Sequence, residues 1–120
     1  MSETMLSADL AIECWKLRRA LQRTLEFAPE AARSRVAAQV RYSSTRLEQL
    51  LAASQMRLAE FDGQPYSVEM PASAINADEF DRDDTLFVVD TLEPALIRDM
   101  SVISMGRVYL GKRDADVSRD

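Results

Sequence analysis

One segment of the 120-residue chain comes close to a nucleotide-binding motif. Gly106 and the pair Gly111-Lys112 have the spacing of the phosphate-binding loop G-x-x-x-x-G-K-[ST], in which backbone amides and the lysine hold phosphate groups. Arg113 stands where that motif needs a hydroxyl group for Mg²⁺, and the residues between the two glycines have the pattern of a strand. We therefore expect no nucleotide site in this segment.

An acidic run, Asp78–Asp84, offers several carboxylates close together in the chain. An EF-hand calcium loop needs oxygen ligands at alternate positions, with Gly at the sixth and Glu at the twelfth. No starting point in the run provides that set, so we expect a solvated acidic loop and no metal site. In such a charged, wet loop the pair Asp83 and Asp84 also lacks the burial that raises the pKa of a catalytic carboxyl group.

The residue types on which many enzymes depend are missing. The chain has no histidine, which excludes Ser-His-Asp and Cys-His sites and His-ligated metals. Cys14 is the single cysteine, which excludes an intramolecular disulfide and a cysteine-based zinc site. We expect Cys14 to be a small buried hydrophobic residue on the apolar face of a helix. The sequence thus predicts a binding protein without a cofactor, and not an enzyme.

The net charge of −5 is unevenly distributed. Residues 1–60 hold nine basic and seven acidic residues, a balance of +2, whereas residues 61–120 hold six basic and thirteen acidic residues, a balance of −7. An acidic second half argues against a nucleic-acid partner. No apolar run reaches the ~20 residues that span a bilayer, and Met1–Leu6 lacks the basic start of a signal peptide. We expect a cytoplasmic protein that does not contact membranes.

Any functional residues must be positioned by the elements that the hydrophobic pattern predicts. Residues 1–62 read as a helical dimerisation region, in which Pro29 separates two helices and the second begins near Glu30. We expect the second helix to continue to Phe61, with a possible break at residues 42–45.

Each predicted helix carries an apolar stripe at spacings of three and four residues. Two helices cannot bury two long stripes against each other, so we expect hairpins from two chains to form a four-helix bundle. The alternative is a single hairpin that packs on the second half of its own chain. The residues expected at the dimer interface are Leu10, Cys14, Leu17, Leu21, Val40, Leu47, Leu50 and Leu58.

Residues 63–112 read as a small β domain, and residues 113–120 as a charged tail. Strands are predicted from short alternating or continuous apolar runs, with a hairpin turn at Asp99-Met100. The predicted strands are Tyr66–Met70, Leu86–Val89, Leu96–Arg98, Ser101–Ser104 and Arg107–Leu110. The fold class is therefore α+β, with a helical hairpin first and a small all-β domain after it.

The segment Phe87–Lys112 resembles the closing segment of GrpE, the nucleotide exchange factor of DnaK-type chaperones. That family's segment reads approximately V-V-E-V-L-x-P-G-Y-x-x-x-x-R-V-L-R-P-A-x-V-V-V-x-K. The match runs without a gap, and the positions with like residues are Val88, Val89, Asp90, Leu92, Pro94, Val102, Ile103, Val108, Leu110 and Lys112.

Earlier segments are similar to the same family in a looser way. Cys14–Leu21 is similar to its L-D-x-L-E-R-A-L stretch, Arg46–Leu51 to its short second helix, and Gly63–Tyr66 to the G-x-P-F that leads into its β domain. The resemblance thus spans about residues 10–112.

The resemblance implies a homodimeric co-chaperone that acts by binding. One β domain would dock on a DnaK-type chaperone ATPase, or on a DnaK-like paralogue, and stabilise its open cleft so that ADP leaves. The partner-binding residues expected from the aligned segment are Glu93, Pro94, Leu96, Met100, Met105 and Arg107. Ser104 stands where the family has an arginine that belongs to the docking part of the β domain, which indicates a divergent relative with a specialised partner.

Two other functions fit the same pattern. A small acidic secretion chaperone or adaptor would bind an unfolded segment in place of a folded ATPase domain. A structural interaction module inside a larger assembly would use the β half for contacts and would not respond to nucleotide.

Overall fold

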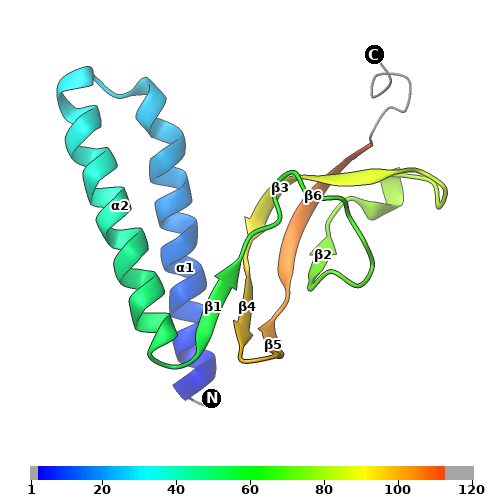
Figure 1. Ribbon diagram of the computed structural model, residues 1–120. Helices are drawn as coiled ribbons and strands as arrows, with labels where there is room; N and C mark the ends of the chain where they lie inside the picture. The colour runs from blue at the N-terminus through cyan, green and yellow to red at the C-terminus, as the bar shows by residue number, and fades with distance from the viewer. Residues whose placement is uncertain (1–2, 113–120) are drawn as a thin grey trace.

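The computed structural model describes residues 3–112, with side chains from residue 7 onward. The helices α1 (Glu3–Thr24) and α2 (Glu30–Ala52) form an antiparallel hairpin, joined by the short 3₁₀ helix η1 (Leu25–Phe27). Figure 1 shows α1 between α2 on one side and the strands on the other. Both helices contact the strands, α1 at β3 and β5 and α2 at β1.

The turn between the helices is fixed by one side chain. Arg33, in the first turn of α2, donates from its guanidinium group to the carbonyl oxygens of Leu25 (3.0 Å), Ala28 (3.1 Å) and Glu26 (3.4 Å). These carbonyls follow the end of α1, where backbone acceptors lack helical partners. The predicted break at Pro29 and the start at Glu30 are both confirmed.

The second half contains six strands in two three-stranded sheets. One sheet has the order β1-β4-β5 and is antiparallel throughout. The other has the order β2-β6-β3, in which β2 is parallel and β3 antiparallel to β6. The strands are β1 (Met56–Ala59), β2 (Ala72–Ala74), β3 (Leu86–Glu93), β4 (Ala95–Arg98), β5 (Ser101–Ser104) and β6 (Gly106–Lys112), with the 3₁₀ helix η2 (Ala77–Glu79) between β2 and β3.

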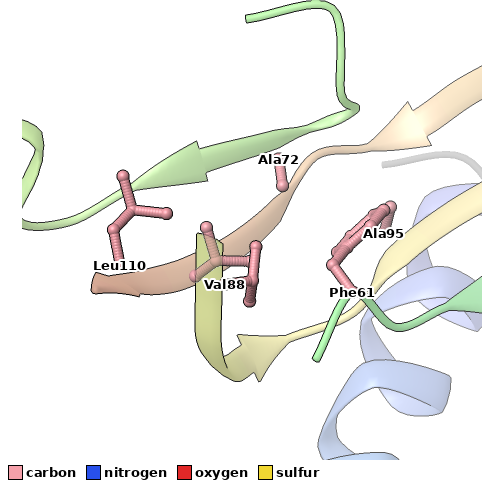
Figure 2. Packing of buried hydrophobic residues seen from close by; sticks show 6 residues of the cluster. Phe61, Ala72, Val88, Ala95 and Leu110 are labelled. Atoms are coloured by element: carbon pink, nitrogen blue, oxygen red, sulfur yellow. The ribbon is translucent and has the colours of Figure 1, made fainter. Parts of the chain in front are cut away.

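The molecule has two hydrophobic cores. The residues of the first core join the helices to the sheet β1-β4-β5, and they are Ala8, Ala11, Leu51, Met56 and Leu96. The second core lies mainly on the strands β2, β3 and β6 (Figure 2), with Ala95 of β4 added from the first sheet, and its residues are Phe61, Ala72, Val88, Ala95, Val108 and Leu110. The sheet β1-β4-β5 therefore packs both on the helices and on the second core.

Gly106 lies where the two sheets meet. A Cβ atom at this position would approach the Glu93 carbonyl oxygen to 2.9 Å and the Ala95 nitrogen to 3.0 Å, both of them backbone atoms that cannot move aside cheaply. The glycine of the apparent phosphate-binding motif is therefore required for packing, and its surroundings are strands β3, β4 and β6.

The α+β class and the order of helices before strands are confirmed, as are the strands predicted around residues 86–89, 96–98, 101–104 and 107–110. The prediction that the second helix continues to Phe61 is wrong, because α2 ends at Ala52 and Met56–Ala59 forms β1. The left-handed Gln55 (φ 59°) turns the chain, and β1 then pairs with β4. The boundary expected between the helical region and the β domain, at residues 62 and 63, consequently separates β1 from the other two strands of the sheet β1-β4-β5.

The strand predicted at Tyr66–Met70 is also wrong. This segment turns back on itself, since the amide of Met70 donates to the Ser67 carbonyl (3.0 Å) and the amide of Glu69 donates to the Ser67 hydroxyl (3.1 Å). A serine that bonds to nearby backbone amides competes with strand pairing. The expected charged tail, residues 113–120, lies outside the described residues.

Candidate interaction surfaces

Helix α1 has two apolar faces on opposite sides. The buried face points toward the β half and α2, and it consists of Ala8, Ala11, Ile12 and Trp15. The other face is exposed, and it consists of the predicted interface residues Leu10, Cys14, Leu17 and Leu21. The helical period places these four within one narrow stripe, since they are separated by four, three and four residues.

The exposed stripe bears on two expectations, the burial of Cys14 and the dimer interface. Cys14 is exposed in the single chain, so the prediction of a buried residue is wrong for the monomer. Leu17 is 73% exposed, although leucine side chains are usually removed from water. The geometry thus leaves an apolar stripe that nothing in residues 3–112 covers, as a dimer interface would require.

Helix α2 adds to the same side of the hairpin. Leu50 and Tyr42 are exposed, whereas Val40 is buried and Leu47 is half-buried. A shallow depression beside the α1 stripe is lined by Cys14, Arg18, Tyr42, Ser43, Arg46, Leu47 and Leu50. We call the set Leu10, Cys14, Leu17, Leu21 and Leu50 the helical face.

Leu58 is not part of the helical face. It was expected on the second helix, but it lies in β1 opposite Leu96 of β4 and packs against the core between helices and sheet. Leu58 follows Leu50 and Ser54 at steps of four residues, which is a helical spacing, but α2 ends at Ala52 before this pattern reaches Leu58. Leu58 is therefore removed from the predicted dimer interface.

A row of ion pairs connects the basic side of α1 to the acidic β half. Successive basic residues of α1 reach acidic groups that lie far away in the sequence. The pairs are Lys16–Glu93 (3.2 Å), Arg18–Glu60 (3.5 Å), Arg19–Asp62 (2.8 Å) and Arg23–Asp90 (2.6 Å). We call these four pairs the brace. They follow α1 over about two turns and cross from the helix to the β half, beside the hydrophobic core that packs the helices on β1 and β4.

Trp15 anchors the brace at its buried side. Its indole N–H donates to a carboxylate oxygen of Glu60 (2.9 Å), and the guanidinium carbon of Arg19 lies 4.6 Å from the centroid of the ring. Trp15 is 1% exposed and therefore belongs to the interior. A buried indole N–H ordinarily finds such a partner.

Within the brace, Asp62 has a pKa below its ordinary value. Burial raises its pKa, but hydrogen bonds from Arg19 and Thr91 outweigh that effect and bring the pKa below its ordinary value. The Thr91 hydroxyl accepts a hydrogen bond from the Phe61 amide (2.9 Å), and the Thr91 amide donates to Asp62. The brace is thus joined directly to the core of the β half.

Two further groups carry shifted pKa values near the surface. Hydrogen bonds to Glu13 and Glu93 raise the pKa of Lys16. At the acidic loop, the pKa of Asp84 is lowered. A hydrogen bond from the Asp81 amide has the largest effect, Lys112 also lowers the pKa, and burial partly opposes both by raising it. Lys112, the lysine of the apparent phosphate-binding motif, pairs with Asp84 at 3.3 Å. The ammonium group of Lys112 therefore binds a carboxylate of the same chain, whereas the lysine of a phosphate-binding loop binds phosphate.

The partner-binding residues expected from the GrpE resemblance divide into two groups. Met100 at the tip of the β4–β5 hairpin is 97% exposed, Met105 is 49% exposed, and Arg107 is also exposed. Glu93 is half-buried and links Lys16 (3.2 Å) to Arg107 (3.9 Å). Met100 lies at the turn of the β4–β5 hairpin, whereas Glu93, Met105 and Arg107 lie near the opposite ends of these two strands.

Pro94 and Leu96 are buried, so their assignment as contact residues is wrong. Leu96 is 0% exposed and packs in the core shared by α1, α2, β1 and β4. Pro94 is likewise fully enclosed between β3 and β4. A side chain that is not exposed cannot contact a partner unless the fold opens.

A groove of about 310 Å³ lies between α1, α2 and β1. Its walls include Trp15, Leu47, Leu51 and Leu58. Arg18 and Glu60, which also line it, pair with each other, so we assign no ligand to this groove.

Other kinds of site receive no support from the geometry. Within residues 3–112, no three Cys, Asp or Glu side chains are grouped so that they could hold a metal ion. In the same part of the chain, neither helix combines the length and the apolar character needed to cross a bilayer. Comparison with known proteins found no matching family model, no matching curated protein and no matching solved structure.

The sequence carries one signal for the brace, although it does not identify the pairs. This signal is the basic balance of residues 1–60 beside the acidic balance of residues 61–120, which alone suggests an outside partner as readily as an internal one. Complementary charges on two halves of one chain can instead neutralise each other. Which residues pair could not be found from spacing, because the partners are separated by 42 to 77 positions.

Proposed function

We propose that this protein is a GrpE-like co-chaperone, in which the β half docks on a DnaK-type ATPase and promotes ADP release. The observation that carries the proposal is the exposure of Met100, at the tip of the β4–β5 hairpin, and of Met105, directly after β5. In the same GrpE-like segment Val88, Leu96, Val108 and Leu110 are buried. Methionine side chains are flexible and polarizable, and exposed ones are common on protein-binding surfaces. A cytoplasmic location is part of the proposal.

The proposed mechanism is a shift of population. A protein that binds the open state of the ATPase more tightly than the closed state increases the open fraction, and only this difference in affinity matters. The contacting part must then hold its shape, since a loose contact would bind both states similarly. The brace provides that stiffness, because it holds the β half against α1 by four ion pairs.

We further propose that the protein is a homodimer held by the helical face. The leucines and Cys14 on this face form a stripe at near-heptad spacing, which is the pattern that antiparallel helix bundles bury. The partner that fits such a stripe is a second copy, because a two-fold axis brings each apolar stripe against its equivalent. A dimer would leave both β4–β5 hairpins accessible, since Figure 1 places them on the far side of α1 from α2.

Ser104 bears on the choice of ATPase. It is half-buried in β5, where the GrpE family carries an arginine of the docking region. Without that charge, the contact must rely on Met100, Met105 and Arg107. A partner ATPase that docks here would not need an acidic group opposite position 104. We therefore propose a specialised DnaK-like paralogue as the first candidate.

The experiment that tests the proposal measures release of a fluorescent ADP analogue from each DnaK-type ATPase of the host. We expect excess protein to accelerate release from one of them. The double variant Met100→Asp/Met105→Asp should lose at least about tenfold in the concentration dependence, since contact residues in a small interface often carry that much binding energy. The control is Val68→Asp, which adds one of these negative charges, where the double variant adds two, on a residue that is 91% exposed in the loop before β2.

Two outcomes would contradict the proposal. Release that is unchanged for every ATPase of the host would leave the adaptor and the structural module as the candidate functions. Equal loss in the Met100→Asp/Met105→Asp variant and in Val68→Asp would show a charge effect without a specific surface.

A further inference from the structure

The outer side of β5 is an open sheet edge. In the sheet β1-β4-β5, β5 pairs with β4 on one side, and no other segment within residues 3–112 bonds to its opposite side. An unpaired edge presents a row of backbone N–H and C=O groups that another extended chain can bond. Proteins commonly protect such edges with charged residues or proline, but Ser101–Ser104 contains neither.

Another edge of the molecule is closed. The outer side of β3 is covered by the loop that follows β1, through bonds from the Gly63 amide to the Val88 carbonyl (2.8 Å) and from the Tyr66 amide to the Leu86 carbonyl (2.9 Å). In the other direction, the Val88 amide donates a hydrogen bond to the Gln64 carbonyl of the same loop (2.9 Å). The fold thus protects the longest strand and leaves the short strand β5 available.

Val102 is the residue whose backbone faces outward. Asp99 (φ 54°) and Met100 form a two-residue turn, so Arg98 and Ser101 are the closing pair of the hairpin. Paired and unpaired amides alternate along an antiparallel ladder, and Val102, opposite Ile97, comes next. Its N–H and C=O groups therefore point away from β4.

The side chains around this edge define the chemistry of the chain that would fit. Val102 is half-exposed on the face away from the helices, and the exposed Met100 and Met105 lie at the two ends of β5. Ile103, on the opposite face, packs against the core with Leu96. Arg107, which follows shortly after β5, is exposed and carries a positive charge.

We propose that the β5 edge binds an extended segment of a partner protein, which adds as a fourth strand to the sheet β1-β4-β5. The segment has small or β-branched residues opposite Val102 and an acidic residue that reaches Arg107. A partner segment fits better than β5 of a second copy, because it can supply the acidic group that Ser101–Ser104 lacks. This inference deepens the proposed function, since it states how the β half would hold its ATPase.

The first arm of the test does not depend on the ATPase. The probe is the acetylated and amidated peptide Glu-Val-Thr-Val-Glu at millimolar concentration, and the readout is the amide NMR spectrum of the full-length, ¹⁵N-labelled protein. We expect the amides of β5, with Val102 foremost, to shift on titration. Shifts confined to other elements, or no shifts at all, would overturn the inference whatever the ATPase does.

Three variants of one residue separate backbone from side-chain effects. Val102→Pro removes the outward N–H, and Val102→Glu places at the edge a charge that repels the acidic peptide; both should weaken peptide binding at least about tenfold. Val102→Thr keeps the shape and the N–H, and its affinity should stay within about twofold of the wild type. Circular dichroism checks that each variant is folded, and Val102→Glu remains decisive if the proline variant is unstable.

The second arm uses the ATPase whose ADP release responds to the protein. Hydrogen exchange at β5 should slow by at least about tenfold in the complex, and Val102→Glu should abolish the acceleration of release. Acceleration that persists in Val102→Glu would overturn the edge contact while the proposed exchange function stands. Peptide binding without any responsive ATPase would instead support the edge and contradict the exchange function. Concentration-dependent dimerisation through β5, lost in Val102→Glu, would assign the edge to a second copy and overturn the partner assignment.

Discussion

Leu96 and Met105 both lie in the segment that resembles GrpE, yet the fold treats them in opposite ways. Leu96 is enclosed by residues of α1, α2 and β1, whereas Met105 has about half of its surface in water. At the scale of single residues, a contact role is therefore open to Met105 and closed to Leu96.

The difference predicts different stability costs. Leu96→Ala leaves a cavity in the core between helices and sheet and should lower the free energy of unfolding by about 2–5 kcal/mol. Met105→Ala should change it by no more than about 0.5 kcal/mol, because exposed residues contribute little packing. Urea unfolding monitored by Trp15 fluorescence measures both. Equal costs for the two variants would show that Leu96 is not in the core.

The side chain of Asn76 is buried and bonds to the backbone of β6. Its side-chain amide donates to the Leu110 carbonyl (3.0 Å) and accepts from the Leu110 amide (2.9 Å), and the residue is 4% exposed. Asn76→Ala would leave both backbone groups of Leu110 without this partner in a buried place, at a cost of about 2 kcal/mol or more. Thermal unfolding compares it with Ser73→Ala, an exposed serine in β2 that should be nearly neutral.

At the scale of elements, α1 carries two functions on two faces. One face packs the hairpin onto the sheet β1-β4-β5, and the opposite face presents the leucine stripe. The charged residues between these faces form the brace, which connects α1 to the acidic groups of the β half. A single helix therefore determines both the proposed dimer and the orientation of the β half.

The pKa of Asp62 predicts a pH dependence for this connection. Its pKa in the folded protein lies below the ordinary value of 3.8, so the ionised group stabilises the fold above that value. The stabilisation is lost as the pH falls from about 3.8 through the lowered pKa. Urea unfolding of wild type and Asp62→Asn from pH 6 to pH 2.5 should show two stability curves that converge at acidic pH. A constant difference between the curves would contradict the lowered pKa.

At the scale of the whole molecule, the exposed helical face predicts self-association. Leu17→Glu places a charge in the middle of the stripe and should shift a dimer toward monomer by at least about tenfold in the dissociation constant. Gln22→Glu, on the same helix but outside the stripe, adds the same charge and serves as the control. Sedimentation velocity over a range of concentrations measures both. A wild-type protein that remains monomeric at high concentration would contradict the dimer.

The sequence by itself determined the order and the type of most elements. Pro29 separates two periodic segments, and the short apolar runs after residue 85 all became strands. These features are local, because helix periodicity, proline and strand alternation act within a few residues of each other. The exposed stripe of α1 could be read in the same way, since its four residues share one face in any helix.

Only the tertiary structure decided the rest. Met56–Ala59 continues a helical pattern, yet it forms β1 because pairing with β4, whose residues lie 36 or more positions away, outweighs local propensity. Leu96 and Met105 look alike in the sequence, and their burial follows from which elements meet around them. The brace likewise joins charges from distant parts of the chain, and no spacing rule relates them. Long-range pairing and packing, which have no local signature, therefore separate the surface that can bind from the core that supports it.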